Sequence, residues 1–193
     1  MRKMIPVALC LVVAAHPSNL EAQRGGAPDS ATDITAADVQ AVSDSPSGGI
    51  DRQIKIVDVG EANIAVGVLH RGELENDGGP ANGLVHERVT EVYYITSGGG
   101  TLVTGGTVSK VRDYGPDSGV VTLLVGPSYL STSVGGRSRD LSVGDIVVIP
   151  AGVFHAWSEI PDHVTYLSYR PDLDKVLPGG YVNPALGEQP PGK

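Results

Sequence analysis

The segment GLVHERVTEVYYITSGGGTLVTGG (83–106) places an imidazole and a carboxylate near each other, two side-chain types that move protons and coordinate metals. His86 and Glu91 are five residues apart, so a single straight strand would point them to opposite faces. A turn over 88–90 would instead let them converge from adjacent strands. Glu91 and Tyr93 would then share one strand face.

A second segment, GDIVVIPAGVFHAW (144–157), contains turn residues that bring another histidine to the start of a strand. Pro150 ends the preceding strand because it has no N–H to donate, and Gly152 permits a tight turn. His155 then begins a strand and shares a face with Trp157.

Three other sequence patterns resemble catalytic or phosphate-binding motifs, but the residues around them do not fit those motifs. HERVTE (86–91) lacks the second histidine and the surrounding helix of a zinc-protease motif. The glycine-rich GGGTLVTGG (98–106) is followed by a strand and turn residues, whereas phosphate-binding loops lead into a helix. No serine lies in a nucleophile-elbow motif, so a serine hydrolase of that type has no support.

The elements that position these residues are short β-type runs separated by glycine and proline, which predict an all-β sandwich or barrel. One short helix, TAADVQAVSD, is expected to begin at the N-cap Thr35, with Asp38 completing a capping box. The predicted strands are IKIVDV (54–59), NIAVGVLH (63–70), TEVYYIT (90–96), TLVT (101–104), VVTLLV (120–125), IVVIP (146–150) and HVTYLSY (163–169).

Composition supports one folded domain and narrows its partners. Apolar residues make up 40% of the 193, enough for a core, and the 26 glycines and 14 prolines suit a turn-rich fold. The 22 acidic residues outnumber the 14 basic ones, giving a net charge of −8 without any basic run. We therefore expect no binding to nucleic acids or to anionic membrane surfaces.

The first residues are typical of a secretory signal peptide, with a basic start, an apolar stretch of 11 residues (5–15) and a small residue, Ala22, at the cleavage position. Cleavage would remove Cys10, the only cysteine, and leave a periplasmic or secreted protein with neither disulfide nor thiolate. The predicted divisions are a signal peptide (1–22), a linker with the short helix (23–50), a barrel (51–171) and an irregular tail (172–193).

The two segments together resemble the paired motifs of the cupin superfamily, whose fold is a double-stranded β-helix or jelly-roll barrel. The family's second motif, G-x5-P-x-G-x2-H, is matched at every specified position, by Gly144, Pro150, Gly152 and His155. The resemblance extends over about 50–171 and implies the same barrel for this chain.

The first motif, G-x5-H-x-H-x3-4-E-x6-G, is degraded. His86, Glu91 and Gly98 occupy the places of its second histidine, glutamate and final glycine. Leu84 stands where the family has its first histidine, and Gly83 is too close to be the opening glycine. This departure removes one histidine donor from the family's pattern, and the fold prediction does not depend on it.

The resemblance implies that His86, Glu91 and His155 point into the mouth of the barrel. Two imidazoles and a carboxylate can hold one divalent transition metal, Fe, Mn, Zn or Ni, with open positions for ligand and water. The alternative is a metal-free pocket in which the two histidines hydrogen-bond to Glu91 or to water.

His70 could replace the histidine that is missing at Leu84. It follows Ile64, Val66 and Val68 on the bulkier face of its predicted strand, and it would point inward if that face lined the barrel. The alternative is a solvent-facing histidine at the edge of a loop. His163, which follows a Pro-Asp pair, is expected to be exposed.

Candidate pocket residues are the aromatic Tyr93, Trp157 and Tyr166, which could seat a substrate or simply fill the barrel core. Arg88, on the side-chain parity of His86, could meet an anionic substrate, or it could be a solvated turn residue. The segment between the two motifs, 98–144, is long, and we expect it to contain lids, interface pieces or mobile loops.

These features predict an exported single-domain cupin with a mononuclear metal at the barrel mouth. If it is an enzyme, metal-dependent oxidation of a small organic molecule, of dioxygenase type, is the first hypothesis. The second is a non-catalytic cupin that binds a small molecule or sugar, with weak or no metal. Isomerase or lyase chemistry would need a further acid–base residue that the sequence does not identify. Cupin-like domains often dimerise, so the resemblance also implies a homodimer.

Overall fold

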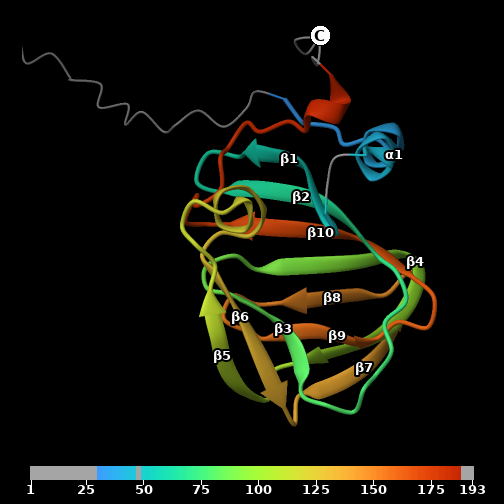
Figure 1. Cartoon of the computed structure of the whole chain (residues 1–193). Coiled ribbons are helices and arrows are strands. Elements are labelled where there is room, and N and C mark those ends of the chain that lie inside the picture. Colours follow the sequence, from blue (N-terminus) through green and yellow to red (C-terminus); the bar gives the residue numbers. More distant parts are fainter. Residues whose placement is uncertain (1–29, 47–48, 188–193) are drawn as a thin grey trace, which may run out of the picture.

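The computed structural model describes residues 30–46 and 49–187, which form a jelly-roll barrel of antiparallel strands with one α-helix on its outside (Figure 1). The predicted signal peptide, 1–22, and Cys10 lie outside the described residues. In chain order the elements are α1 (Ala36–Asp44), β1 (Asp51–Asp58), β2 (Asn63–Arg71), β3 (Ala81–His86), β4 (Glu91–Thr104), β5 (Thr107–Asp113), the π-helical turn η1 (Val120–Leu124), β6 (Ser128–Val134), β7 (Arg137–Ser142), β8 (Ile146–Ile149), β9 (His155–Glu159), β10 (Val164–Asp172) and the 3-10 turn η2 (Pro184–Leu186).

The long strand β4 belongs to both faces of the barrel. Its first half pairs with β10 and β8, and β10 continues the sheet to β2 and β1. Its second half pairs with β7 and β9, and β9 continues the other sheet to β3, β6 and β5. All of these pairings are antiparallel, so the prediction of an all-β double-stranded β-helix with a short N-terminal helix is confirmed.

Strand β4 changes sheets at a run of three glycines. Gly98 has a φ of 65°, and a Cβ there would lie 1.9 Å from the carbonyl oxygen of His163. Only glycine combines this left-handed backbone with so close an approach to β10. The glycine run that ends the first motif is therefore the corner of the barrel.

The main core lies between the two sheets and takes apolar side chains from both. From the first sheet come Leu69, Tyr93 and Tyr166, and from the second come Leu102 and Trp157. Burial of each such side chain contributes roughly 1.5–3 kcal/mol to folding. This aromatic core also forms the floor and wall of the pocket described below.

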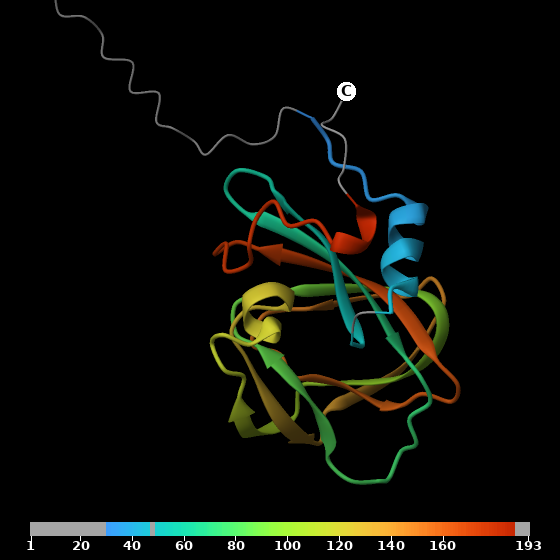
Figure 2. The same ribbon diagram turned by 45° about the horizontal axis from the view of Figure 1, so that its top comes forward.

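Helix α1 covers the outer face of the β1–β2 ribbon, as both views of the ribbon show (Figures 1 and 2). It begins as predicted, because the Thr35 side chain accepts from the Asp38 N–H while the Asp38 carboxylate accepts from the Thr35 N–H. Val42 is fully buried against Val66 and Val68 of β2. The outward face of β2 is therefore apolar as well as the inward one.

The run 120–125, predicted as a strand, is wrong in type: most of it forms the π-helical turn η1. Its continuous apolar letters fit a strand or a short helix equally well. Its backbone hydrogen bonds are local, from Ser118 to Val125, and form turns in place of a strand pairing. Val120 and Leu124 instead line the pocket.

The segment between the motifs was expected to supply lids and loops, and most of it instead builds the second sheet. Strands β5, β6 and β7 lie within 107–142, on either side of η1, with β6 between β3 and β5 in the sheet. Apolar alternation missed β5 because it is an edge strand exposed at every position, where charged side chains such as Lys110 and Arg112 discourage further pairing.

The chain after β10 is irregular but packed. Leu177 is buried against Ile56 and Ala65, and its N–H donates to the Asp172 carboxylate. Residues further on return along β1, where Val182 pairs with Lys55. Within the described part of the chain, no helix is long and apolar enough to cross a membrane.

Candidate metal centre

Three strand ends bring His86, Glu91 and His155 together. His86 is the last residue of β3, Glu91 the first of β4 and His155 the first of β9. The chain reverses direction between His86 and Glu91, which lets the two side chains converge, and the Gly152 N–H donates to the His86 carbonyl at 2.7 Å. The turn after Pro150 is thereby attached to the end of β3.

The donor atoms of these three residues converge. The His86 Nε2 and the His155 Nε2 lie 3.1 and 3.3 Å from the same oxygen, Glu91 Oε2. One donor atom from each residue lies within 4.8 Å of the others, and all three residues are buried. Within the described residues no other cluster of histidine, cysteine or carboxylate groups meets this condition.

The opposite ring nitrogens are already engaged, which fixes the state of the imidazoles. The His155 Nδ1 lies 3.1 Å from the Val153 carbonyl, which can only accept, so this nitrogen carries the hydrogen. The His86 Nδ1 lies 2.9 Å from the Ser128 hydroxyl, whose own hydrogen is donated to the Gly126 carbonyl. Both neutral rings therefore aim an Nε2 lone pair at Glu91.

Glu91 is held as a carboxylate. Its Oε1 accepts from the Ser168 hydroxyl at 2.8 Å and from the Arg170 Nε at 2.9 Å, and its Oε2 accepts from the Tyr93 hydroxyl at 2.9 Å. Burial acts to raise the pKa of Glu91, but the positive charge of Arg170 holds it well below its usual value.

The electrostatics of the centre suit a cation. Burial lowers the pKa of His86, despite the neighbouring carboxylate, so this imidazole resists a second proton. Its lone pair and that of His155 then face the negative oxygen of Glu91. Two imidazoles and one carboxylate form a donor set for a divalent transition ion, so the residues present fit the metal that the motifs imply.

A fully buried arginine, Arg170, supports the centre from behind. Besides Glu91, it donates to the Gln53 side chain, to the Leu124 carbonyl and to Asp51 Oδ2, at distances of 2.6–3.2 Å. Sequence reasoning missed this residue, although strand parity could have found it. Arg170 follows Tyr166 and Ser168 at the two-residue period of the inward face of β10.

The pocket beside the centre has a volume of about 560 Å³. Its lining includes the metal-centre residues and side chains from both sheets and from η1. The lining residues used below are Asp51, Leu69, Arg71, Leu84, Tyr93, Val120, Leu124 and Trp157. Burial raises the pKa of Asp51 in spite of the neighbouring Arg170 charge.

Among the aromatic candidates, Tyr93 and Trp157 line the pocket. Tyr166 is fully buried behind them, and its hydroxyl accepts from the Trp157 Nε1 at 3.3 Å and from the Arg71 Nε at 3.2 Å. Tyr166 therefore acts on the pocket through the two side chains that it positions.

The expectation that His70 supplies a further ligand is wrong. His70 is exposed, its Nδ1 bonds to Thr165 Oγ1 at 2.8 Å, and its ring stacks on His163. The face of β2 that carries Val66, Val68 and His70 packs under α1, whereas Leu69 and Arg71 face the pocket. The prediction correctly placed Val66, Val68 and His70 on one strand face. That face points outward and not into the barrel, because helix α1 covers its bulky apolar residues.

Arg88 is also not a pocket residue. It is about half exposed, and its Nε donates to Asp174 at 2.9 Å on the surface. The arginine in the pocket is Arg71, the last residue of β2, which sequence reasoning did not single out. The signal that could have found it is again the inward parity of β2.

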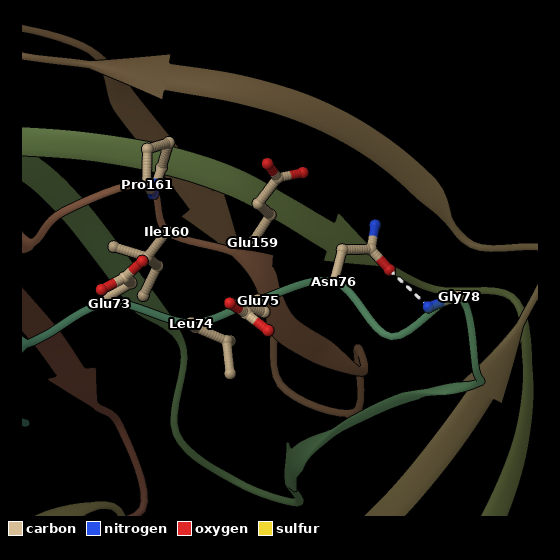
Figure 3. A pocket seen from close by; sticks show the side chains of 8 residues that line it. All are labelled: Glu73, Leu74, Glu75, Asn76, Gly78, Glu159, Ile160 and Pro161. Atoms are coloured by element: carbon tan, nitrogen blue, oxygen red, sulfur yellow. Dashed lines mark hydrogen bonds between the residues drawn. The ribbon is translucent and has the colours of Figure 1, made fainter.

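A second hollow, of about 570 Å³, lies beyond Leu74, which borders both hollows (Figure 3). Figure 3 shows the three carboxylates around it, those of Glu73, Glu75 and Glu159. Leu74 pairs with Ile160 through two backbone hydrogen bonds of 2.9 Å, so this loop is attached to the end of β9. No histidine lines this hollow.

No protein-family model and no curated protein matches the chain. Among solved structures, the DMSP lyase DddQ from Ruegeria pomeroyi DSS-3 is 16% identical, with a TM-score of 0.40 over 76% of this chain and 60% of that one. The chain thus spans three fifths of DddQ.

A double-stranded β-helix protein from Klebsiella pneumoniae is 17% identical, with a TM-score of 0.40 over 74% of this chain and 91% of that one. The polyketide cyclase RemF from Streptomyces resistomycificus is 16% identical, with a TM-score of 0.38 over 74% and 80%.

The strand pairing described above and the positions of both motifs on it decide the architecture. The chain has a cupin-type fold. On this cupin barrel, Leu84 lies directly opposite His155 across the β3–β9 pairing and lines the pocket. Its side chain has no donor atom, so the centre offers a metal three protein side chains.

Proposed function

We propose that this chain is an exported cupin that holds one divalent transition metal at His86, Glu91 and His155, and that it oxidises a small organic molecule in the adjoining pocket. The reaction proposed is of dioxygenase type. The observation that carries the metal is the convergence of two imidazole lone pairs on one oxygen of a buried carboxylate.

Physical chemistry favours a cation at this point. A buried ionised carboxylate needs compensating charge, and lone pairs that face one another without a hydrogen or a cation between them repel. The Nδ1 atoms of His86 and His155 already donate elsewhere, so relief must come at Nε2. It can come from a metal ion or from a second proton on each ring.

A transition ion with open coordination positions can bring dioxygen or a substrate oxygen onto a Lewis acid. The residues of the chain would hold and shield that site. Tyr93 stays a hydroxyl donor, since burial raises its pKa well above the usual value, and it orients Glu91. Trp157, Leu84 and Leu124 form apolar walls that exclude water and seat the substrate.

The second candidate is a non-catalytic cupin that binds a small molecule without metal. The observation that favours it is Leu84, which removes one donor from the family's usual set. In that case the two histidines hydrogen-bond to Glu91 or to water and form one wall of a metal-free pocket. Metal analysis separates the two candidates.

Protein purified without added metal should contain about one transition ion per chain. A ligand present at a hundredfold excess over its Kd stabilises the native state by about 2.7 kcal/mol, so a chelator should lower the melting temperature. His155→Ala should abolish both the metal content and the chelator response. The matched control is His163→Ala, which removes a surface histidine and should retain both.

An unchanged melting temperature with chelator, together with no metal by elemental analysis, would leave the metal-free binder as the function. Export is a separate part of the proposal, and it is supported by the basic start and apolar stretch of 1–22. N-terminal sequencing should find a chain that begins near Gln23, and an intact Met1 on cytoplasmic protein would refute export.

A further inference from the structure

Arg71 is a positive group on the pocket wall, at the end of β2 and on the opposite strand face from the exposed His70. It is the last residue of that strand and shares the inward parity of Leu69, and both side chains line the pocket. His70, between them, points to the outside. The backbone thus aims Arg71 at the cavity.

One edge of the Arg71 guanidinium is fixed and the other is unused. Its Nε donates to the Tyr166 hydroxyl at 3.2 Å, and the same hydroxyl accepts from Trp157. Within residues 30–46 and 49–187, no carboxylate forms an ion pair with Arg71, and neither terminal nitrogen forms a hydrogen bond to the protein. Arg170, in contrast, pairs with two carboxylates.

The Arg71 side chain is half-buried on the pocket wall, and its two terminal nitrogens carry four hydrogens that can donate to an acceptor in the pocket. Arginine presents these donors in a planar fork, whose geometry matches a carboxylate and allows two parallel hydrogen bonds. The fixed Nε leaves the terminal nitrogens oriented in advance, so little side-chain entropy would be lost when an anion binds.

The charges around the pocket point the same way. Arg71 and Arg170 supply two positive charges, which Asp51 and Glu91 balance when both are ionised. A divalent ion at the centre would then leave the pocket with an excess of two positive charges. A ligand that carries a carboxylate would reduce this excess, whereas a cationic ligand would increase it.

The pocket also combines polar and apolar walls. Tyr93 and Trp157 lie on its wall with Arg71 and with the His86–Glu91–His155 centre, and the volume of about 560 Å³ suits one small molecule. We propose that the ligand of this pocket is a small carboxylate with an apolar or aromatic body, and that Arg71 binds its carboxylate group. This assignment rests on the proposed function for the reaction at the metal, and it names the substrate class.

The test uses acetate, benzoate and 3-phenylpropanoate as probes, each compared with its neutral amide, which has nearly the same shape. Calorimetry measures Kd for the purified full chain, as isolated and after metal removal with a chelator. At least one aromatic carboxylate should bind about tenfold or more tightly than its amide, because a charged hydrogen bond contributes that much. Measurement without metal is needed because a carboxylate could also bind the ion directly.

Arg71→Met should remove the preference for the carboxylate over the amide, and Arg71→Lys should keep part of it. The control is Arg88→Met, which removes an arginine outside the pocket and should leave the preference unchanged. A melting curve for each variant shows that it is folded. If Arg71→Met fails to fold, the Arg71→Lys variant and the carboxylate–amide comparison on the natural chain still decide.

The proposal is overturned if no probe binds as a carboxylate in preference to its amide, or if the preference survives Arg71→Met. Failure of the proposed function has a different signature. If the protein contains no metal and its melting temperature does not respond to chelator, yet it prefers carboxylates through Arg71, the metal assignment is wrong and this inference stands. If the protein holds metal but shows no Arg71-dependent preference for carboxylates, only this inference is wrong.

Discussion

His86 and His155 lie with ring centroids 4.8 Å apart, and His70 and His163 with centroids 5.8 Å apart, but the two pairs differ in where their nitrogens point. In the buried pair, both Nδ1 atoms are engaged by the chain and both Nε2 atoms meet at Glu91. In the surface pair, His163 uses both nitrogens on Asp162 and Ser97.

The comparison teaches that histidines close in space are not sufficient for a metal site. The buried pair is held by groups that fix each ring and by an ionised carboxylate that Arg170 keeps charged. The surface pair is attached to hydroxyl groups and to an exposed Asp162. The buried histidine pair differs from the surface pair in its burial and in its convergent Nε2 lone pairs. Substitutions can alter each pair separately.

The largest effect should come from Arg170→Met. This change leaves the buried Glu91 and the partly buried Asp51 without their shared cation, and removal of one partner from a buried ion pair typically costs about 3–5 kcal/mol. Urea unfolding should show this loss. Arg88→Met, which breaks a surface pair, should leave the stability nearly unchanged. Equal losses of unfolding free energy in the two variants would mean that the buried ion pairs contribute no more to stability than the surface pair.

A smaller effect should appear in the pH dependence of metal-free protein. Because burial lowers the pKa of His86 in the folded state, the unfolded chain binds more protons at this residue below about pH 6.5. Stability is therefore complete above that pH and is lost as the pH falls toward the lowered pKa, with a slope of up to about 1.4 kcal/mol per pH unit.

The measurement is urea unfolding at a series of pH values between 7.5 and 5, in the presence of chelator. His86→Gln should flatten the curve over this window, and His70→Gln should leave it as it is. A slope that survives His86→Gln would assign the titration to another group and weaken the contrast between the two histidine pairs.

The smallest effect is expected at the surface pair itself. His70→Ala should change neither metal content nor affinity, because its ring lies outside the barrel. Leu84→His, in contrast, places an imidazole opposite His155 and should tighten metal binding. Competition with a chromogenic chelator measures both. Loss of metal in His70→Ala would show that the two pairs are coupled.

Much of the centre could be predicted from the sequence, because the motif resemblance implied that His86, Glu91 and His155 converge and the turn residues allowed it. Convergence of His86 and Glu91 needs a chain reversal between them, and β3 does end at the first residue while β4 begins at the second. Pro150 and Gly152 likewise determine the turn that delivers His155 to the start of β9. The capping box at Thr35 is equally local and formed as predicted.

Tertiary structure alone decided what depends on contacts between distant segments. Period-two alternation in β2 separates His70 from Arg71, but it does not say which face points inward. Helix α1 decides this by covering the face of Val66 and Val68, so that Arg71 lines the pocket and His70 meets solvent. Arg170 is buried because Asp51 and Glu91, more than 75 residues away, provide its partners. A residue pattern records alternation along one strand, and only the packing of other elements gives that alternation a direction.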